Sequence, residues 1–202
     1  MTAVLALVLY LGGLTAAFGW RSVVQRRRTG DTGLRLDAGR PGSPRWWAKL
    51  LFVAALLLGA AGPVAALAGL APIRALDRTW LGIAGAILAL CGLAATLVAQ
   101  HQMGASWRVG VDPGERTALI THGAFRFARN PVFTAMVATS VGLAALVPNP
   151  VSLAATLLLV AAVQLQVRVV EEPYLARTHG AEWAGYAVRV GRFLPVTGRH
   201  RR

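Results

Sequence analysis

The sequence contains little cysteine and few acidic residues, and both shortages narrow the class of protein. Cys91 is the only cysteine among 202 residues, which excludes an intramolecular disulfide framework and a zinc site built on cysteine pairs. Eight residues are Asp or Glu against 21 Lys or Arg, so the formal net charge is +13. No G-x-G-x-x-G motif follows a predicted strand, so the dinucleotide-binding fingerprint is missing as well.

Charge is also missing from four long runs of a chain that is 55% hydrophobic. The uncharged runs are residues 2–20, 50–73, 79–107 and 131–167. A basic nucleic-acid-binding protein would spread its positive charge over an amphipathic surface, whereas here the charges and the apolar residues are segregated. This segregation is typical of a membrane protein, so we expect membrane lipids as partners and no nucleic acid.

The last uncharged run is long enough for two helices, because a membrane-spanning helix needs about 20 apolar residues. Pro148-Asn149-Pro150 divides it into 131–147 and 151–170. Proline is acceptable in the first turn of a helix, where no amide donor is needed, so Pro131 and Pro150 are expected to begin helices. The sequence therefore predicts an all-α integral membrane protein with five transmembrane helices, the last two forming a helical hairpin.

The positive charges predict how the chain lies in the membrane. No positive charge precedes the first apolar run, so we expect a spanning helix rather than a cleaved signal peptide. With the N-terminus outside, 19 of the 21 Lys and Arg residues face the cytoplasm, as the positive-inside rule requires. Eight of them lie in residues 21–49, which we expect to form a basic loop on anionic lipid. The Ala-, Arg-, Gly- and Val-rich composition is typical of a bacterial inner-membrane protein.

Polar groups suited to chemistry lie in two stretches, residues 101–133 and 164–195. The first three spans carry no such group, so we divide the chain into an N-terminal membrane part, 1–100, and a functional core, 101–202. A helical hairpin returns to the face from which it started. The two polar stretches are therefore expected to meet at the cytoplasmic face, where the C-terminal segment would complete the site.

Glu171 and Glu172 directly follow the fifth predicted span. Carboxylates at a membrane border are costly unless they are paired, solvated or functional. Arg168 lies three and four residues before them on the same helix, and Arg129 is expected nearby, so ion pairing is one interpretation. A ligand-binding role is the other, and the residues alone leave both open.

The order of the motifs along the chain favours ligand binding over ion pairing alone. The segment THGAFRFARNPVF (121–133), a hairpin, and EEPYLARTHGAEWAGYAVRVGRFLP (171–195) together resemble the isoprenylcysteine carboxyl methyltransferase family, which is related to membrane phospholipid N-methyltransferases. The resemblance covers about residues 101–196. The matching positions are Gly123, Phe125, Arg129, Asn130, Pro131, Phe133, Glu171, Glu172, Leu175, Gly180, Trp183, Tyr186, Arg192 and Pro195.

The resemblance implies a membrane methyltransferase that uses S-adenosylmethionine and methylates an amphiphilic acceptor through a carboxylate, thiol or amine. It implies that the cofactor is bound by Thr117, Leu119, Ile120, Gly123, Phe125, Asn130, Pro131, Val132, Phe133 and Glu171. The catalytic residues that it implies are Arg168, Glu171 and Glu172. Arg168 would meet an anionic group of the substrate, and Glu172 or His122 would matter for an amine acceptor, which must lose a proton first.

Two departures and two alternatives accompany this interpretation. Asn130 and Phe133 stand where many family members have His and Tyr, so the identity of the acceptor does not transfer. A membrane NAD(P)H-dependent reductase of related C-terminal architecture is one alternative. A non-enzymatic membrane scaffold, held at the inner leaflet by its basic tail GRHRR, is the other.

The four histidines match no zinc-binding spacing, so we expect no metal.

Overall fold

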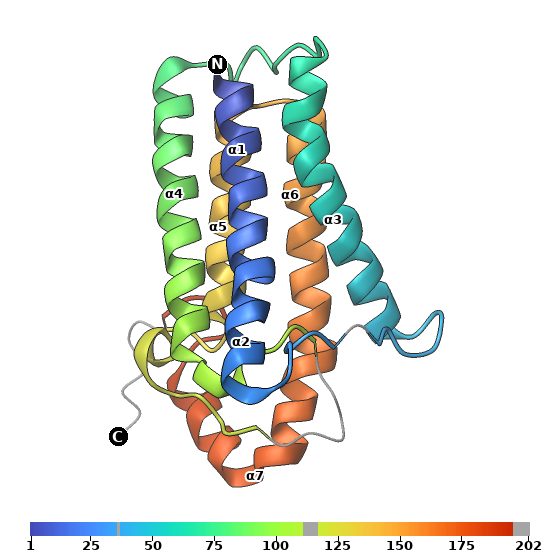
Figure 1. Ribbon diagram of the computed structural model, residues 1–202, viewed down its shortest axis with the longest axis vertical. Helices are drawn as coiled ribbons and strands as arrows, with labels where there is room; N and C mark the ends of the chain where they lie inside the picture. The colour runs from blue at the N-terminus through green and yellow to red at the C-terminus, as the bar shows by residue number, and fades with distance from the viewer. Residues whose placement is uncertain (36, 111–116, 196–202) are drawn as a thin grey trace.

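The computed structural model describes residues 1–35, 37–110 and 117–195, and they form a bundle of long helices (Figure 1). Arg116, which entered the charge count, lies outside the described residues. The basic tail 198–202 also lies outside them, so the expectation of a lipid-binding tail stays a prediction.

The helices follow the uncharged runs of the sequence. The N-terminal part contains α1 (Thr2–Leu14), the π-helix η1 (Thr15–Trp20), α2 (Arg21–Thr29), α3 (Pro44–Leu67) and α4 (Thr79–Gln102). Two short 3₁₀ turns follow, η2 (Gly104–Ser106) and η3 (Gly123–Arg126). The C-terminal part contains α5 (Pro131–Leu146), α6 (Pro150–Leu165), the π-helix η4 (Gln166–Glu171) and α7 (Glu172–Arg189).

Proline and a polar cap begin the helices where the sequence predicts them. Pro131 and Pro150 each occupy the first turn of a helix, α5 and α6. Asn149 caps α6 by accepting a hydrogen bond from the amide of Ser152 at 2.9 Å, and its amide donates to the carbonyl of Gly62 at 2.9 Å. The Pro-Asn-Pro turn is thereby fastened to α3, and the predicted hairpin of the last two apolar segments is confirmed.

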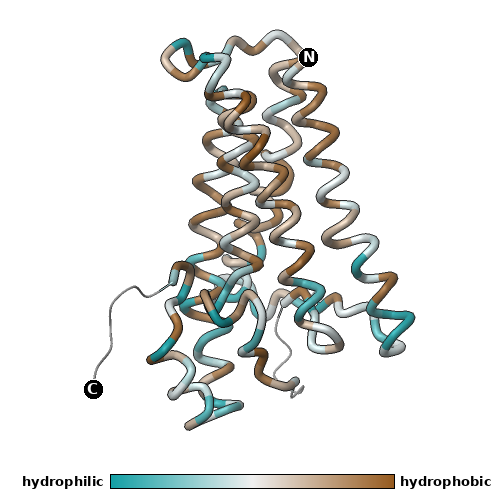
Figure 2. Tube along the Cα trace, turned by 90° about the vertical axis from the view of Figure 1, so that its left-hand side faces the viewer, coloured by the Kyte–Doolittle hydropathy of each residue, from teal (hydrophilic) through white to brown (hydrophobic). Residues whose placement is uncertain are grey.

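The all-helical fold is confirmed for the described residues, whereas the count of five spans stays a prediction because α5 is short. Four helices are long and apolar enough to cross a membrane: Thr2–Thr29, Pro44–Leu67, Thr79–Gln102 and Pro150–Arg189. Helix α5 has 16 residues. At 1.5 Å per residue it spans about 24 Å, less than the roughly 30 Å of the hydrocarbon core. Hydrophobic colouring runs along the bundle and hydrophilic colouring gathers at its ends (Figure 2).

The helix Pro150–Arg189 is too long to lie wholly inside a bilayer. It has 40 residues and turns at Gly180. The roughly 30 residues before that turn alone extend about 45 Å, against about 30 Å for the hydrocarbon core. The uncharged residues 150–167, which are α6 and the start of η4, are the part that can span, because the first charge after Pro150 is Arg168. Glu171 and α7 therefore lie beyond the membrane-spanning segment.

The first helix does not end at Trp20 as the sequence predicted. It continues through η1 and α2 to Thr29, so the irregular part of the expected loop over 21–49 shrinks to residues 30–43. Tertiary contacts explain the extension, because Arg21 and Gln25 are buried against the end of α4. The side-chain amide of Gln25 donates to the carbonyl of Ala105 at 2.7 Å.

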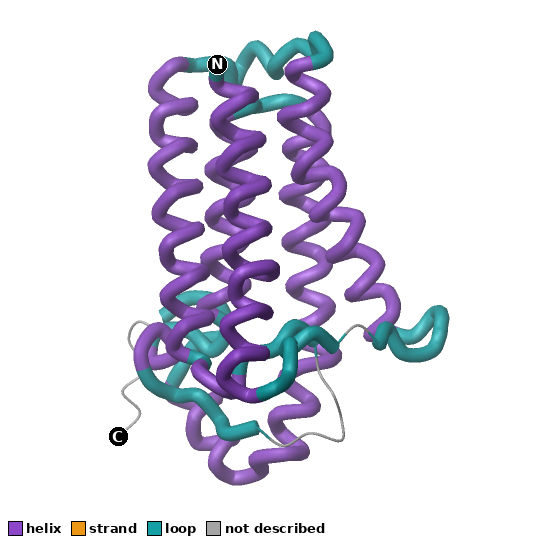
Figure 3. The backbone as a smooth tube through the Cα atoms, viewed as in Figure 1, coloured by secondary structure: helices purple, strands orange, loops and turns teal. Residues whose placement is uncertain are grey.

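Helix α7 folds back beneath the bundle and brings the two motif stretches together. Gly180 bends it with left-handed backbone angles (φ 49°, ψ −119°). The returning chain then pairs with the segment before α5. The amides of Arg129 and Asn130 donate to the carbonyls of Gly191 at 2.8 Å and Arg192 at 3.1 Å. Figure 3 shows the loops gathered at the two ends of the bundle.

Candidate active site

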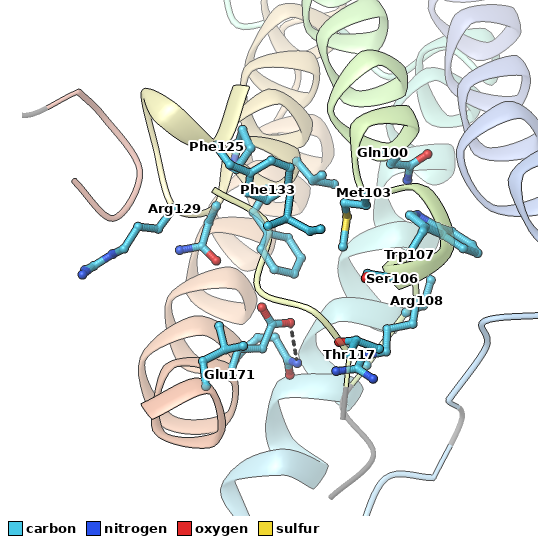
Figure 4. A pocket seen from close by; sticks show the side chains of 18 of the residues that line it. Gln100, Met103, Ser106, Trp107, Arg108, Thr117, Phe125, Arg129, Phe133 and Glu171 are labelled. Atoms are coloured by element: carbon cyan, nitrogen blue, oxygen red, sulfur yellow. Dashed lines mark hydrogen bonds between the residues drawn. The ribbon is translucent and has the colours of Figure 1, made fainter. Parts of the chain in front are cut away.

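A cavity of about 220 Å³ lies at the α7 end of the bundle (Figure 4). Both motif stretches line it, as expected from the hairpin. The predicted cofactor residues that line the cavity are Thr117, Leu119, Ile120, Phe125, Asn130, Pro131, Val132, Phe133 and Glu171. One wall therefore comes from the segment before α5 and the first turn of α5, and the facing wall comes from η4 and α7.

Hydrogen bonds fix the first of these walls to the C-terminal segment. Asn130 is buried, and its side-chain amide donates to the carbonyl of Arg192 at 3.1 Å. The hydroxyl of Thr134 donates to the carbonyl of Phe193 at 2.9 Å. The hydroxyl of Tyr186 donates to the carbonyl of Phe125 at 2.6 Å. Asn130 thus holds the wall together through its side chain, and the wall cannot form without the returning chain.

Glu171 is the only carboxylate among the described residues that line the cavity. Burial raises its pKa to about 7, although the nearby side chains of Gln166 and Arg108 oppose the shift. Gln166 donates a hydrogen bond from Nε2 to Oε1 of Glu171 at 3.0 Å. Both residues belong to the π-helical turn η4, and such turns often mark functional sites because they redirect side chains.

Glu172 lies next to Glu171 but does not line the cavity. Its carboxylate pairs with Arg129 at 3.0 Å and with Arg192 at 2.6 Å. The guanidinium of Arg129 also lies 5.4 Å from the centre of the Trp183 ring and donates to the carbonyl of Ala187 at 3.0 Å. The expected proximity of Arg129 to this carboxylate is confirmed. The position of Glu172 fits an ion-paired support for the wall rather than the proposed catalytic group.

Arg168 and Gly123 also lie outside the cavity lining. Arg168 is exposed, and its Nε donates to the side chain of Gln164 at 2.6 Å, so its position does not support contact with the substrate. Gly123 has a positive φ of 59°, and a Cβ there would come within 2.4 Å of Gln102 Oε1. Its role is therefore a tight turn packed on the end of α4.

The cavity also takes lining residues from the first three predicted spans, where the sequence showed no polar group suited to chemistry. The lining residues that sequence reasoning did not assign to the site include Phe18, Ala48, Lys49, Phe52, Gln100, Met103, Ser106, Trp107, Arg108, Gln166, Tyr174, Leu175, Trp183 and Tyr186. The motif positions already pointed to Leu175, Trp183 and Tyr186. No local pattern marks Phe18 or Phe52, because an aromatic residue in an apolar run looks the same whether it faces lipid or a cavity.

Arg108 adds a positive charge opposite Glu171. Its guanidinium lies 5.6 Å from the centre of the Tyr174 ring, and Nη2 donates to the Tyr174 hydroxyl at 3.4 Å. The cavity thus holds both signs of charge at its polar end and aromatic surface elsewhere. Within residues 1–35, 37–110 and 117–195, no group of three or more His, Cys, Asp or Glu residues is arranged to hold a metal ion.

Comparison with known families places the C-terminal part of the chain. A family model described as phospholipid methyltransferase matches residues 80–182, just over half of the chain. No curated protein matches the chain. The matched range contains α4, the hairpin and most of the cavity lining, whereas α1, α2 and α3 lie before it.

Proposed function

Because the chain belongs to the phospholipid methyltransferase family and is therefore related to membrane methyltransferases, we propose that it is an S-adenosylmethionine-dependent enzyme. Its acceptor is an amphiphile with a carboxylate, thiol or amine, methylated at the cytoplasmic face of the membrane. The observation that carries this proposal is the single cavity lined by both motif stretches.

The cavity residues fit the chemistry of this cofactor. S-adenosylmethionine would supply an electrophilic methyl group on a sulfonium cation. Glu171 is half-buried, faces the cavity and holds its proton up to about pH 7, so a cationic group nearby would favour its ionised form. Phe125 and Phe133 offer ring faces for the adenine, and the segment from Thr117 to Ile120 would line its other side.

The chain's contribution to methyl transfer is positioning and exclusion of water. A carboxylate or thiolate acceptor needs no general base, because the attacking group is already an anion. An amine acceptor must first be deprotonated, and Glu171 is the cavity carboxylate available for that proton. Glu172 is committed to Arg129 and Arg192, and His122 is exposed and outside the lining, so neither takes that role here.

The same proposal places the α7 end of the bundle in the cytoplasm. The described basic residues of α2, of residues 30–43 and of α7 all lie at that end, together with the cavity. Only Arg74 and Arg78 lie between α3 and α4, at the opposite end. The positive-inside rule then supports a periplasmic N-terminus and five spans, with α5 accommodated by close packing against α4.

Ligand-induced stabilisation tests the proposed function. We expect S-adenosylhomocysteine to raise the melting temperature of the detergent-purified protein, since a ligand at about 100 times its Kd stabilises the folded state by about 2.7 kcal/mol. Stabilisation by a reduced nicotinamide cofactor in its place would favour the reductase. No stabilisation by either would favour the scaffold, and both results would overturn the proposal.

A further inference from the structure

Part of the cavity wall comes from outside the family-matched range. Phe18 belongs to η1, and Ala48, Lys49 and Phe52 belong to the first turns of α3. The matched range begins only at residue 80, so these four residues are not part of the shared methyltransferase core.

The two phenylalanines form an apolar contact between η1, which continues α1, and α3. Their ring centroids lie 6.4 Å apart in an edge-to-face arrangement. On one side of this pair the helices are tightly packed, because a Cβ at Gly59 would come within 2.7 Å of the Tyr10 ring. Toward the cavity end, α3 leans away from α1 (Figure 1). Phe18 and Phe52 thus lie where the two helices separate.

Lys49, the chain's one lysine, adds a charge beside this apolar contact. It precedes Phe52 by three residues on α3, so both side chains lie on one helix face. Its Nζ donates to the carbonyls of Arg35 at 3.0 Å and Asp37 at 2.8 Å. An ammonium has three N–H donors, so one remains without an acceptor among the described residues.

The loop that anchors Lys49 also joins it to the wall that carries Arg108. Residues 33–35 pair with Val109: the amide of Arg35 donates to the carbonyl of Val109 at 2.9 Å, and the amide of Val109 donates to the carbonyl of Gly33 at 2.8 Å. Arg35 therefore accepts from Lys49 through its carbonyl and donates to Val109 through its amide. Lys49 and Arg108 consequently lie on adjoining walls of one cavity.

The lining carries more positive than negative charge. Its cationic side chains are Lys49, Arg108 and Arg129, and its only described carboxylate is Glu171. Arg129 is neutralised by Glu172 behind the wall, whereas Lys49 keeps an N–H donor with no acceptor among the described residues. A partly buried ammonium with a donor to spare favours an anionic ligand. If Glu171 serves a cationic cofactor, Lys49 is left for the acceptor.

We propose that Lys49, Phe18 and Phe52 form an acceptor-selecting site for an amphiphile with an anionic head group, a carboxylate or a phosphate ester. The head group lies at Lys49, and the apolar chain lies against Phe18 and Phe52, where α1 and α3 separate. The inference rests on the proposed methyltransferase function and concerns only the choice of acceptor.

Binding of matched probes tests the site without requiring turnover. Palmitate, hexadecyl phosphate, hexadecylamine and hexadecanol share a chain length and differ in the head group. Each would compete with a fluorescent fatty acid for the full-length protein in phosphatidylcholine nanodiscs. We expect the better anionic probe to bind at least about tenfold more tightly than the amine. Tighter binding of palmitate would identify the head group as a carboxylate, and tighter binding of hexadecyl phosphate would identify it as a phosphate ester.

Substitutions separate the head group from the chain. Lys49→Gln should weaken the anionic probes about tenfold and leave hexadecanol unchanged, whereas Lys49→Arg should keep the preference for anions. Phe52→Ala and Phe18→Ala should weaken all four probes alike, because they remove contacts to the chain. Phe127→Ala is the matched control, since this phenylalanine is 64% exposed and lies outside the cavity lining.

The outcomes distinguish this inference from the proposed function. Hexadecylamine binding as tightly as both anions, or Lys49→Gln keeping the anion preference, overturns the acceptor site. Stabilisation by S-adenosylhomocysteine reports separately on the proposed function and also shows that each variant is folded. If Lys49→Gln is not stabilised by S-adenosylhomocysteine, it is not properly folded. The head-group preference is then measured on the parent and on Lys49→Arg, which should both bind the anionic probes more tightly than the amine.

Discussion

Gln166 and Glu171 are joined by a 3.0 Å hydrogen bond across a single π-helical turn at the point where the long C-terminal helix leaves the apolar bundle. This bond turns the carboxylate of Glu171 toward the cavity, while Glu172, the next residue, points to Arg129 and Arg192 behind the wall. Two adjacent carboxylates thereby acquire different surroundings. Glu171 lines the cavity, and Glu172 is neutralised by arginines.

Binding of S-adenosylmethionine should tighten as the pH rises toward 7. The pKa of Glu171 is about 7 without ligand, so at lower pH the carboxyl must lose its proton before it can pair with a cation. This costs up to about 1.4 kcal/mol, or about tenfold in affinity, per pH unit below the pKa. Titration calorimetry in buffers of different ionisation enthalpy measures both the affinity and the released proton.

Glu171→Gln removes this titrating group and keeps the shape of the side chain. We expect it to bind S-adenosylmethionine more weakly than the parent above pH 7 and to lose most of the pH dependence. A variant that binds the cofactor as tightly as the parent at pH 8 would show that Glu171 does not contact it.

The stability of the ligand-free protein should change with pH in the opposite direction. The folded-state pKa of Glu171 is raised from its ordinary value of 4.5 to about 7, so between these values the folded protein binds more protons than the unfolded chain. Its contribution is fully present below about pH 4.5 and is lost as the pH rises through 7. The parent should lose on the order of 2 kcal/mol relative to Glu171→Gln between pH 5 and pH 8. Thermal unfolding of both proteins in detergent measures the difference, and parallel curves would contradict the assigned burial.

The membrane bundle was predictable from the sequence because its signals are local. Uncharged runs of the right length and proline at helix starts are read directly from consecutive residues, as Pro131 and Pro150 show. The continuation of the first helix to Thr29 was not predictable in this way. It depends on burial of Arg21 and Gln25 against the end of α4, about 80 residues further along the chain.

The site was predictable only where a motif marks it. Both motif stretches line the cavity, and the resemblance already assigned Glu171 to the cofactor, but it named Glu171 and Glu172 alike as catalytic residues. That only Glu171 faces the cavity depends on the π-helical turn. Arg168 shares the same helix and charge pattern but points outward to Gln164. Phe18 and Lys49 enter the site through packing of α1 and α3, which no spacing in the sequence encodes.

Removing the carboxylate of Glu172 should destabilise the α7 end of the bundle. Glu172→Ala leaves Arg129, whose side chain is 11% exposed, without its ion-pair partner. Breaking one side of a buried pair typically costs about 3–5 kcal/mol. Thermal unfolding should show a clear fall in the melting temperature, with a parallel loss of stabilisation by S-adenosylhomocysteine.

Arg168→Ala is the matched control for this variant, because it removes an exposed charge from the same helix. Its melting temperature and ligand response should stay close to those of the parent, as is usual for surface substitutions. Equal effects of Arg168→Ala and Glu172→Ala would contradict the distinction between the two residues, and a loss of acceptor binding in Arg168→Ala alone would restore Arg168 as a substrate contact.

Two glycines on α4 should respond to alanine with opposite signs. A Cβ at Gly85 would lie 2.6 Å from the carbonyl oxygen of Gly142 and 2.8 Å from the amide nitrogen of Leu146, both backbone atoms of α5 that cannot move aside alone. Gly85→Ala should therefore push α5 away from α4 at a cost of about 1–3 kcal/mol, measured as a lower melting temperature. Gly82 has no atom within 4 Å of the same position, so Gly82→Ala should be neutral or stabilising by up to about 1 kcal/mol, since alanine favours helix more than glycine does.

Because α5 begins with the cavity residues Pro131 to Phe133, the Gly85 variant should also bind S-adenosylhomocysteine more weakly. A Gly85 variant as stable as the Gly82 variant would mean that α4 and α5 are not in backbone contact in the membrane.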